Sequence, residues 1–373
     1  MQLSVVILNY NVRYFLEQCI RSVQKALQNI DSEIIVIDNH SADDSCRMIK
    51  ELFPDVILIE NQDNTGFPKG NNIGVARAKG KYLCILNPDT VVSEDTFSKL
   101  LEFSESKANL GIVGCKLIDG TGNFLPESKR NVPTPLVSLK KLLGKTDKYY
   151  ANHLSENQSG KADIFVGAFM FIAREKYLHL GGFDEDFFMY GEDIDLSYRA
   201  VKNEFENYYF ADTAIIHYKG ESTGKDNVYI KRFYSAMQIF YKKHFKTNVF
   251  FDGIITIGIR VFTLLNSVRK NKSVVISPEA YLLISQSEEL QSKLARTLNK
   301  PIERINSFKN LNFNTLKTEI IFDGDYLTNK EIISFIQQNR NKGFTFKIKP
   351  TGTNFIIGSN SKDDKGKVIV ITD

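Results

Sequence analysis

The chain has 373 residues, of which 42% are hydrophobic and 25% charged, so it is long enough for one large domain and a smaller one and too apolar for a disordered chain. Its formal net charge of +4 hides an asymmetry, because seven cations and one acid between residues 241 and 272 give +6 and leave −2 for the rest. A charge confined to one short segment argues against general nucleic-acid binding.

The cysteines and the N-terminus predict an intracellular setting. The four cysteines form no CxxC pair, which favours small core side chains in a reducing cytosol over a zinc site. The apolar run at residues 3–8 has no basic leader before it, so no signal peptide is predicted. We therefore expect a cytoplasmic protein.

One apolar segment, residues 249–265, has two alternative interpretations. Asp252 and Arg260 interrupt it, and lysines and arginines flank it, so a membrane span is the least favoured interpretation. A buried linker helix and a helix lying on an anionic membrane surface remain as alternatives. The second would place the protein peripherally on the inner face of the cell membrane.

The first ninety residues alternate strand-like apolar runs with helical apolar stripes. Ser41 and Asp44 resemble a capping box for the second helix. This alternation predicts an α/β fold with a doubly wound, mainly parallel sheet, in which ligands bind beyond the carboxyl ends of the strands. Strands are predicted at residues 5–8, 34–37, 56–59 and 82–86, and helices at 16–27, 42–53 and 71–78.

The rest of the chain contains a loop-rich segment, further strands and a second αβ rhythm. Residues 120–160 are expected to be a mobile segment over the site. We expect a large domain over residues 1–245, a linker or interfacial helix over 246–272, and a smaller C-terminal α/β domain of unknown role over 273–373. Further strands are predicted at 163–172, 208–210, 214–218, 274–276, 319–322, 344–348, 355–357 and 368–371, and helices at 192–201, 288–298 and 329–339.

Polar residues follow each of the first four predicted strands. Asn9 and Tyr10 follow the first, Asp38 the second, and Asn64 lies beyond the third. Turn chemistry alone explains any one of them, because Asn and Asp favour turns. Four successive strands that deliver hydrogen-bonding groups to one rim fit a polar ligand better, and such a ligand could be a nucleotide sugar.

Several of these residues suit a nucleotide-sugar donor. Asp38 can accept a hydrogen bond from a nucleobase N–H, with capping beside Ser41 as the alternative. Asn64, Gly66 and Asn71 fit a loop that folds over the donor, with a plain turn as the alternative.

Asn87-Pro88-Asp89 is the candidate for the diphosphate end of the donor. Mg²⁺ and Mn²⁺ prefer oxygen ligands and share their sites with substrate phosphates, so Asp89 is a candidate metal ligand. His217 is a second candidate if it lies near Asp89. Taken singly, the tripeptide is a common turn and a lone histidine is more often structural.

The adjacent acids Glu192 and Asp193 are the candidates for the catalytic step. Asp193 could take the proton of an acceptor hydroxyl, and Glu192 could orient that acceptor. The alternative is that both acids complement the positive end of the predicted helix at 192–201, within which Asp195 and Arg199 are spaced for an i,i+4 pair.

Five ordered strings, SVVILNYN, IIVIDNHSADDS, NTGFPKGNNIG, YLCILNPDT and GGFDEDFFMYGEDIDLSYR, resemble the inverting family-2 glycosyltransferases of the GT-A fold, in particular the rhamnosyltransferase-like branch of cell-surface polysaccharide assembly. The resemblance covers residues 1–244. It implies nucleoside contact by Asp38, metal–diphosphate binding at Asn87 and Asp89 with His217, and a base at Asp193. Asn87 departs from the family's acidic first position, which implies modest metal affinity.

The expected activity is metal-dependent transfer of a sugar from a UDP- or dTDP-sugar to a saccharide or lipid-linked acceptor. An inactive glycosyltransferase-like binding or scaffold subunit is the alternative. A nucleotidyltransferase is less favoured, because no glycine-rich loop follows the first strand.

Overall fold

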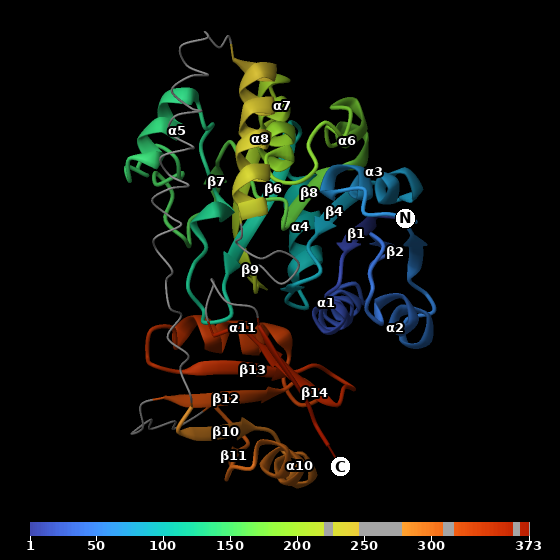
Figure 1. The fold of residues 1–373 in the computed structure, drawn as a ribbon, viewed down its shortest axis with the longest axis vertical. Coiled ribbons are helices and arrows are strands. Elements are labelled where there is room, and N and C mark those ends of the chain that lie inside the picture. Colours follow the sequence, from blue (N-terminus) through green and yellow to red (C-terminus); the bar gives the residue numbers. More distant parts are fainter. Residues whose placement is uncertain (220–226, 246–277, 309–316, 361–365, 373) are drawn as a thin grey trace.

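The computed structural model describes residues 1–219, 227–245, 278–308, 317–360 and 366–372. These residues form two α/β units, each built on one β-sheet, and Figure 1 shows one unit above the other. The larger sheet has nine strands and the smaller has six. The predicted linker at 246–272 and the predicted strand at 274–276 lie outside the described residues.

The first half of the large sheet confirms the predicted parallel α/β arrangement. Its strand order is β3-β2-β1-β4-β8-β6-β9-β5, with β7 paired to β9. The first four strands are parallel to one another, so their carboxyl ends share one rim. They are β1 (Leu3–Asn9), β2 (Ser32–Asp38), β3 (Ile57–Glu60) and β4 (Tyr82–Leu86).

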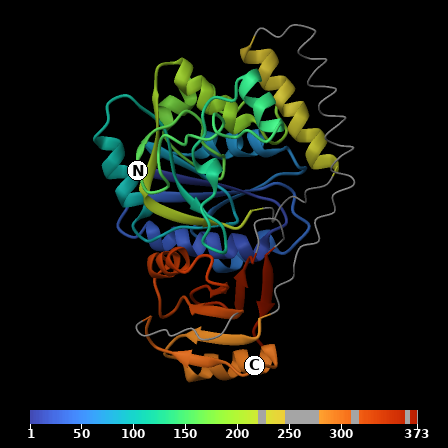
Figure 2. The ribbon, with the colours of Figure 1, turned by 90° about the vertical axis from the view of Figure 1, so that its left-hand side faces the viewer.

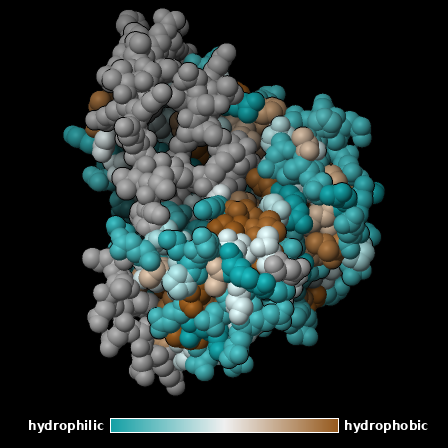
Figure 3. All heavy atoms as spheres, turned by 60° about the horizontal axis from the view of Figure 1, so that its bottom comes forward, coloured by the Kyte–Doolittle hydropathy of each residue, from teal (hydrophilic) through white to brown (hydrophobic). Residues whose placement is uncertain are grey.

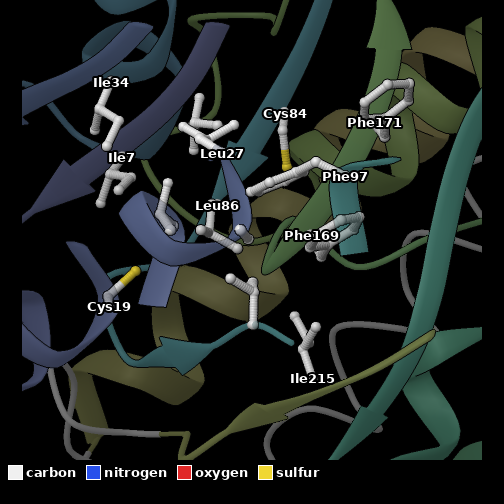
Figure 4. Close-up of a cluster of buried hydrophobic side chains, with 14 of the residues drawn as sticks. Ile7, Cys19, Leu27, Ile34, Cys84, Leu86, Phe97, Phe169, Phe171 and Ile215 are labelled. Atoms are coloured by element: carbon white, nitrogen blue, oxygen red, sulfur yellow. The ribbon is translucent and has the colours of Figure 1, made fainter. Parts of the chain in front are cut away.

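Successive residues of β1 enter two different hydrophobic cores. Val5 and Ile7 pack on one face with α1, and Val6 and Leu8 pack on the other face with α3. Burial on both faces explains why this strand is apolar without alternation. Figure 4 shows part of the first core. The helices here are α1 (Arg13–Ala26), α2 (Ser45–Leu52), α3 (Phe67–Arg77) and α4 (Thr96–Glu105).

The second half of the large sheet differs in detail from the predictions. The strand predicted at 163–172 begins only at Phe169, and β9 (Glu206–His217) is one strand where two short ones were predicted. A register shift after Cys115 places a bulge in the middle of β9, opposite β6. The other strands are β5 (Thr90–Val91), β6 (Leu110–Ile118), β7 (Gly160–Lys161) and β8 (Phe169–Ala173).

The segment 120–160 carries more regular structure than a loop. It contains the 3₁₀-helix η1 (Pro126–Ser128) and the helix α5 (Pro135–Leu142). Three further helices complete this part of the chain: α6 (Arg174–His179), α7 (Glu192–Lys202) and α8 (Asn227–His244). Within α7, the predicted pair is present, with Arg199 Nε 2.7 Å from Asp195 Oδ2.

The second sheet has the order β11-β10-β12-β13-β14-β15. It confirms a second, smaller α/β unit, although β10 and β11 were not predicted. Its strands are β10 (Ala280–Ile284), β11 (Glu303–Ile305), β12 (Thr318–Asp323), β13 (Thr345–Lys349), β14 (Phe355–Gly358) and β15 (Lys367–Val370), and its helices are α10 (Glu288–Leu298) and α11 (Asn329–Gln338).

A shared hydrophobic core joins the two sheets. Phe15 of α1 and Ile216 of β9 belong to the same cluster as Ile332 of α11. The rings of Tyr14 and Phe355 meet edge to face, with centroids 4.9 Å apart. Figure 2 shows the C-terminal unit, in orange and red, beneath the blue helices that cover the lower face of the large sheet. The C-terminal unit is therefore packed against the first one through apolar side chains.

The surface viewed from the C-terminal end is mainly hydrophilic, with hydrophobic residues gathered in separate patches (Figure 3). Within the described ranges, no helix combines the length and the hydropathy that a membrane crossing requires. The apolar segment 249–265 lies outside those ranges.

Candidate functional site

The carboxyl ends of β1 and β2 place Asn9 beside Asp38. The two residues are register partners, and Asn9 Nδ2 donates to Asp38 Oδ1 at 2.7 Å. The other oxygen of Asp38 accepts from the backbone N–H of Ser41 at 2.8 Å. Ser41 therefore belongs to this rim, and the capping box predicted with Asp44 is wrong, because α2 begins only at Ser45. The next residue, Tyr10, is half-buried.

The loop predicted to cover the donor is held by Asn39, which the sequence analysis did not select. Asn39 Nδ2 donates to Asn64 Oδ1 at 2.9 Å, and Asn39 Oδ1 accepts from Thr65 N at 3.1 Å. Gly66 has a φ of +82°, and a Cβ there would lie 2.5 Å from the carbonyl oxygen of Phe188. Glycine at 66 thus allows this loop to touch the segment that leads into α7.

Asn87, Asp89 and His217 meet at the end of β4. The short strand β5 pairs antiparallel with β9, and Thr90 lies opposite His217. As a result, His217 Nε2 lies 3.4 Å from Asp89 Oδ1 and 3.4 Å from Asn87 Nδ2. Asp89 and His217 are buried, at 4% and 6% exposure. The sheet therefore brings these three residues together, although Asn87 and His217 are 130 positions apart in the sequence.

These three residues fit a divalent cation. In an octahedral site with bonds of about 2.1 Å, neighbouring ligand atoms lie about 3 Å apart, close to the observed 3.4 Å between Asp89 Oδ1 and His217 Nε2. Within the described part of the chain, no cluster of three His, Cys, Asp or Glu side chains suits a metal. A cation here would take its remaining ligands from the Asn87 amide, diphosphate oxygens and water.

A half-buried ion pair borders this group. Lys219 Nζ contacts Glu127 Oε1, which comes from η1. Burial alone would raise the pKa of Glu127, but the charge and hydrogen bond of Lys219 and the nearby His217 hold it below its usual range. Glu127 is therefore ionised at neutral pH.

Asp193 lies in the first turn of α7 and is held by a buried arginine. Arg130 Nη2 donates to Asp193 Oδ2 at 2.8 Å, and Gly167 N donates to the same oxygen at 3.1 Å. The other oxygen, Oδ1, accepts from Ile194 N at 2.8 Å. Burial lowers the pKa of Arg130, but the Asp193 charge and Tyr149 outweigh it and raise the pKa above its ordinary value. Arg130 and Asp193 thus form a buried ion pair.

The neighbouring acid, Glu192, has a raised pKa. Its side chain is buried, and burial followed by the charge of Asp193 raises its pKa well above the usual range. A neutral carboxylic acid can donate a hydrogen bond as well as accept one. The two adjacent acids thus differ in their surroundings, because Asp193 is paired with Arg130 and Glu192 Oε2 has no partner among the described residues.

Gly167 and Ala168 connect the Asn87 end of the site to Asp193. Asn87 N donates to Ala168 O at 3.0 Å, and the next residue back, Gly167, donates to Asp193. Two consecutive residues of the backbone therefore contact both halves of the site. A Cβ on Gly167 would lie 3.2 Å from Phe67, which leaves little room for a larger residue.

Five of the predicted site residues carry a buried polar atom that has no hydrogen-bond partner among the described residues. Such atoms are uncommon in folded proteins and are usually satisfied by water, an ion or a ligand. Their concentration at this rim indicates that a polar ligand belongs there. They are Asn9 Oδ1, Asn71 Oδ1, Asp89 Oδ1, Glu192 Oε2 and His217 Nδ1.

Arg130, Glu127 and Lys219 were not selected from the sequence. Two of them lie in the segment 120–160, where the sequence shows proline and glycine and no periodic pattern. The stretch Lys129-Arg130 was visible there as a basic pair, but its carboxylate partner is 63 residues away. Only the fold identifies that partner.

Comparisons with known proteins show which sequences and structures this chain resembles. The sequence model of the family described as Glycosyl transferase family 2 matches residues 4–180. An N-acetylglucosaminyl-diphospho-decaprenol L-rhamnosyltransferase of Mycobacterium tuberculosis is 24% identical, over 60% of this chain and 78% of that protein. The rhamnosyltransferase WbbL of Escherichia coli K12 is 27% identical, over 52% of this chain and 78% of its own length.

A third relative, the low-salt glycan biosynthesis hexosyltransferase Agl10 of Haloferax volcanii, is 26% identical over 53% of this chain and 61% of that protein. Among solved structures, the mannosyltransferase PcManGT of Pyrobaculum calidifontis, in complex with GDP-Man and Mn²⁺, has a TM-score of 0.46 and 18% identity, over 73% of this chain and 76% of that one. S. aureus TarS 1–349 in complex with UDP has a TM-score of 0.47 and 14% identity, over 72% and 73%.

Proposed function

Because this chain belongs to glycosyl transferase family 2 and transfers a sugar from a nucleotide-sugar donor, we propose that it is an inverting, metal-dependent enzyme that uses a UDP- or dTDP-sugar. The acceptor is a hydroxyl group of a saccharide or a lipid-linked saccharide in cell-surface polysaccharide assembly. Two relatives are named as rhamnosyltransferases, and one of those names contains a lipid diphosphate. The observation that carries the proposal is the set of unpartnered buried polar atoms on Asn9, Asp89, Glu192 and His217 around one rim.

The proposed reaction is a single displacement at the anomeric carbon of the donor sugar. The acceptor oxygen forms a bond to that carbon while the bond to the diphosphate oxygen breaks, and the configuration inverts. The proton of the acceptor hydroxyl goes to Asp193. General base catalysis of this kind typically contributes about 10²–10⁴-fold to the rate.

Arg130 and Gly167 prepare Asp193 for this role. Both donate to Oδ2, so the carboxylate is fixed in one orientation. Oδ1 accepts one hydrogen bond from the backbone, which leaves capacity for the acceptor O–H. Glu192, held neutral, would donate to another oxygen of the acceptor and orient it.

Asp89 and His217 would hold Mg²⁺ or Mn²⁺, with Asn87 beside them. When bound, the ion would neutralise the charge that develops on the leaving diphosphate. Asn9 and Asp38 would contact the nucleobase, since a carboxylate offers about four lone-pair positions and Asp38 uses two of them here. Tyr10, Asn64, Gly66 and Asn71 complete the proposed donor side.

A screen of nucleotide sugars by thermal shift in the presence of Mn²⁺ tests the proposal. The correct donor should raise the unfolding midpoint, because a ligand that binds only the folded state stabilises it by mass action. EDTA should remove most of that rise. A midpoint that no nucleotide sugar changes would contradict the proposal, and tight binding without any transfer would favour a glycosyltransferase-like scaffold.

A further inference from the structure

A cavity lies at the other end of the strands from the donor rim. Its volume is about 360 Å³, and it is lined by Tyr82 and Leu110, where β4 and β6 begin, and by Ala173, where β8 ends. The donor rim lies beyond Leu86, at the other end of β4. Because a strand rises about 3.3 Å per residue, this length of β4 separates the two places by about 13 Å or more.

The cavity is strongly basic. Five of its lining residues are cationic and one, Glu175, is acidic. The lining therefore carries a formal charge of +4, equal to the net charge of the whole chain. The cations are Lys79, Lys81, Lys107, Arg174 and Lys176.

These cations lack charged partners. Across the described ranges, none of the five forms an ion pair, and the Nε of Arg174 is buried without a hydrogen-bond partner. Lys176 Nζ donates to the carbonyl oxygen of Leu110 at 2.7 Å. Lys81 and Lys107 lie over the rings of Tyr82 and Tyr208, at 5.3 and 5.6 Å from the centroids.

We propose that this cavity binds a phosphate-bearing anion at a site separate from the donor site. Like charges held close together raise one another's energy, and an anion between them removes that cost. Arginine and lysine N–H groups are the strongest side-chain partners of phosphate oxygens, and the unpartnered Arg174 supplies a planar donor group. The phosphate belongs either to a soluble phosphate compound or to the headgroup of an anionic lipid.

Inorganic pyrophosphate, titrated into the full chain by calorimetry in the presence of EDTA, tests the site. EDTA suppresses binding that depends on a metal at the donor rim. The double variant Lys81→Gln/Lys107→Gln changes two exposed side chains of the cavity and should bind pyrophosphate at least tenfold more weakly. The control, Lys161→Gln/Lys317→Gln, removes the same charge from two surface ion pairs outside the cavity and should bind as the wild type does.

The source of the phosphate is distinguished by co-sedimentation with phosphatidylcholine vesicles that contain or lack phosphatidylglycerol. Weaker pyrophosphate binding with unchanged sedimentation of the cavity variant assigns the site to a soluble phosphate compound. Weaker binding together with reduced sedimentation on the anionic vesicles assigns it to a lipid headgroup. Wild-type protein that does not bind pyrophosphate, or a cavity variant that binds it as well as the wild type, would overturn the proposal.

Discussion

Two adjacent acids at the start of α7 have different surroundings, and the proposed base, Asp193, can be tested by substitution. Asp193 is ion-paired with Arg130, while burial and the charge of Asp193 raise the pKa of Glu192. Replacing Asp193 with Asn should leave donor binding within about twofold and lower the transfer rate by at least about 100-fold, the typical size of a general base contribution. Donor affinity by calorimetry and transfer by product release measure the two effects separately.

Asp186→Asn is the matched control for this change. Asp186 is an exposed acid seven positions earlier in the same segment, and the described structure gives its side chain no ion pair. The control should transfer sugar at the wild-type rate. Wild-type transfer by the Asp193→Asn variant would remove Asp193 as the base.

Asn87 is the residue at which the sequence departs from the family pattern. Its proposed place beside the cation can be tested by replacing it with Asp. Asn87→Asp would add a carboxylate 3.4 Å from the His217 ring and close to Asp89. Divalent cations bind more tightly as the number of anionic ligands rises, so the Mn²⁺ concentration for half-maximal transfer should fall by about tenfold. An unchanged or higher Mn²⁺ requirement would indicate that Asn87 does not face the cation.

The sequence predicted the rim residues better than their partners. Asn9, Asp38 and Asp89 follow apolar strands, and a parallel sheet brings such positions to one edge, so local pattern was sufficient. Arg130 and Lys219 act through carboxylates 63 and 92 positions away. No local periodicity encodes such pairs, because the tertiary fold sets them.

At the scale of elements, Asp195 of α7 forms hydrogen bonds and an ion pair with α8. Its carboxylate has no exposed surface and accepts from Arg199 of its own helix and from Lys243 and His244 of α8. Burial alone would raise the pKa of Asp195, but the hydrogen bond from His244, the Arg199 charge and Lys243 lower it to about 2. The carboxylate therefore stabilises the fold in its ionised form.

The sign of the resulting pH dependence follows from the lowered pKa. Stability from Asp195 is complete above its ordinary pKa of 3.8 and is lost as pH falls toward 2. Asp195→Asn should lower the free energy of unfolding by about 2 kcal/mol at pH 6, and the difference from wild type should shrink below pH 4. Urea unfolding across this range measures it.

The exposed pair Asp44–Arg47 provides the control for that measurement. Asp44→Asn should change stability by less than about 0.5 kcal/mol, because solvent screens ion pairs at the surface. A constant difference between wild type and Asp195→Asn from pH 6 to pH 2 would contradict the assignment.

The helix α11 braces the strands that carry the candidate metal ligands. Glu94, just after β5, accepts from Asn329 N and Lys330 N at the start of α11, at 2.7 and 2.9 Å. Val91 of β5 and Ile216 of β9 share a core with Ile336 of α11. The short strand β5 is therefore supported from the C-terminal unit.

Glycine substitutions test this support. Gly122 and Gly144 have nearly equal φ values, +86° and +82°, but a Cβ at Gly122 would lie 2.4 Å from Ile336 O, whereas a Cβ at Gly144 meets nothing within 4 Å. Both Ala variants bear a backbone cost of about 1–2 kcal/mol, and Gly122→Ala should lose at least about 1 kcal/mol more. Equal thermal destabilisation of the two variants would show that the contact with α11 contributes nothing.

Element boundaries were harder to predict than element types. Local periodicity identified α10 and the first four strands, but α3 begins at Phe67, ahead of the predicted start at residue 71, because Pro68 suits a first helical turn. The bulge in β9 interrupts its alternation, so the sequence suggested two strands. Both differences arise from chain geometry that hydrophobic pattern does not report.

At the scale of the whole molecule, the fold class followed from the alternation of strands and helices, whereas the contact between the two sheets did not. Tyr14, Phe15 and Val12 of the α1 region pack against the C-terminal unit. These residues precede the helix predicted at 16–27, and no contact was predicted for them. The role of the C-terminal unit as a support for β5 and the end of β9 emerges only from the assembled structure.

The account requires acids far apart in the chain to act on one diphosphate-bearing donor, and Mn²⁺-dependent binding of the donor's nucleoside diphosphate tests this most directly. Calorimetry should show at least tenfold weaker binding for Asp89→Asn than for wild type in Mn²⁺, and equally weak binding of both in EDTA. Binding by Asp89→Asn that matches wild type in Mn²⁺ would contradict the account.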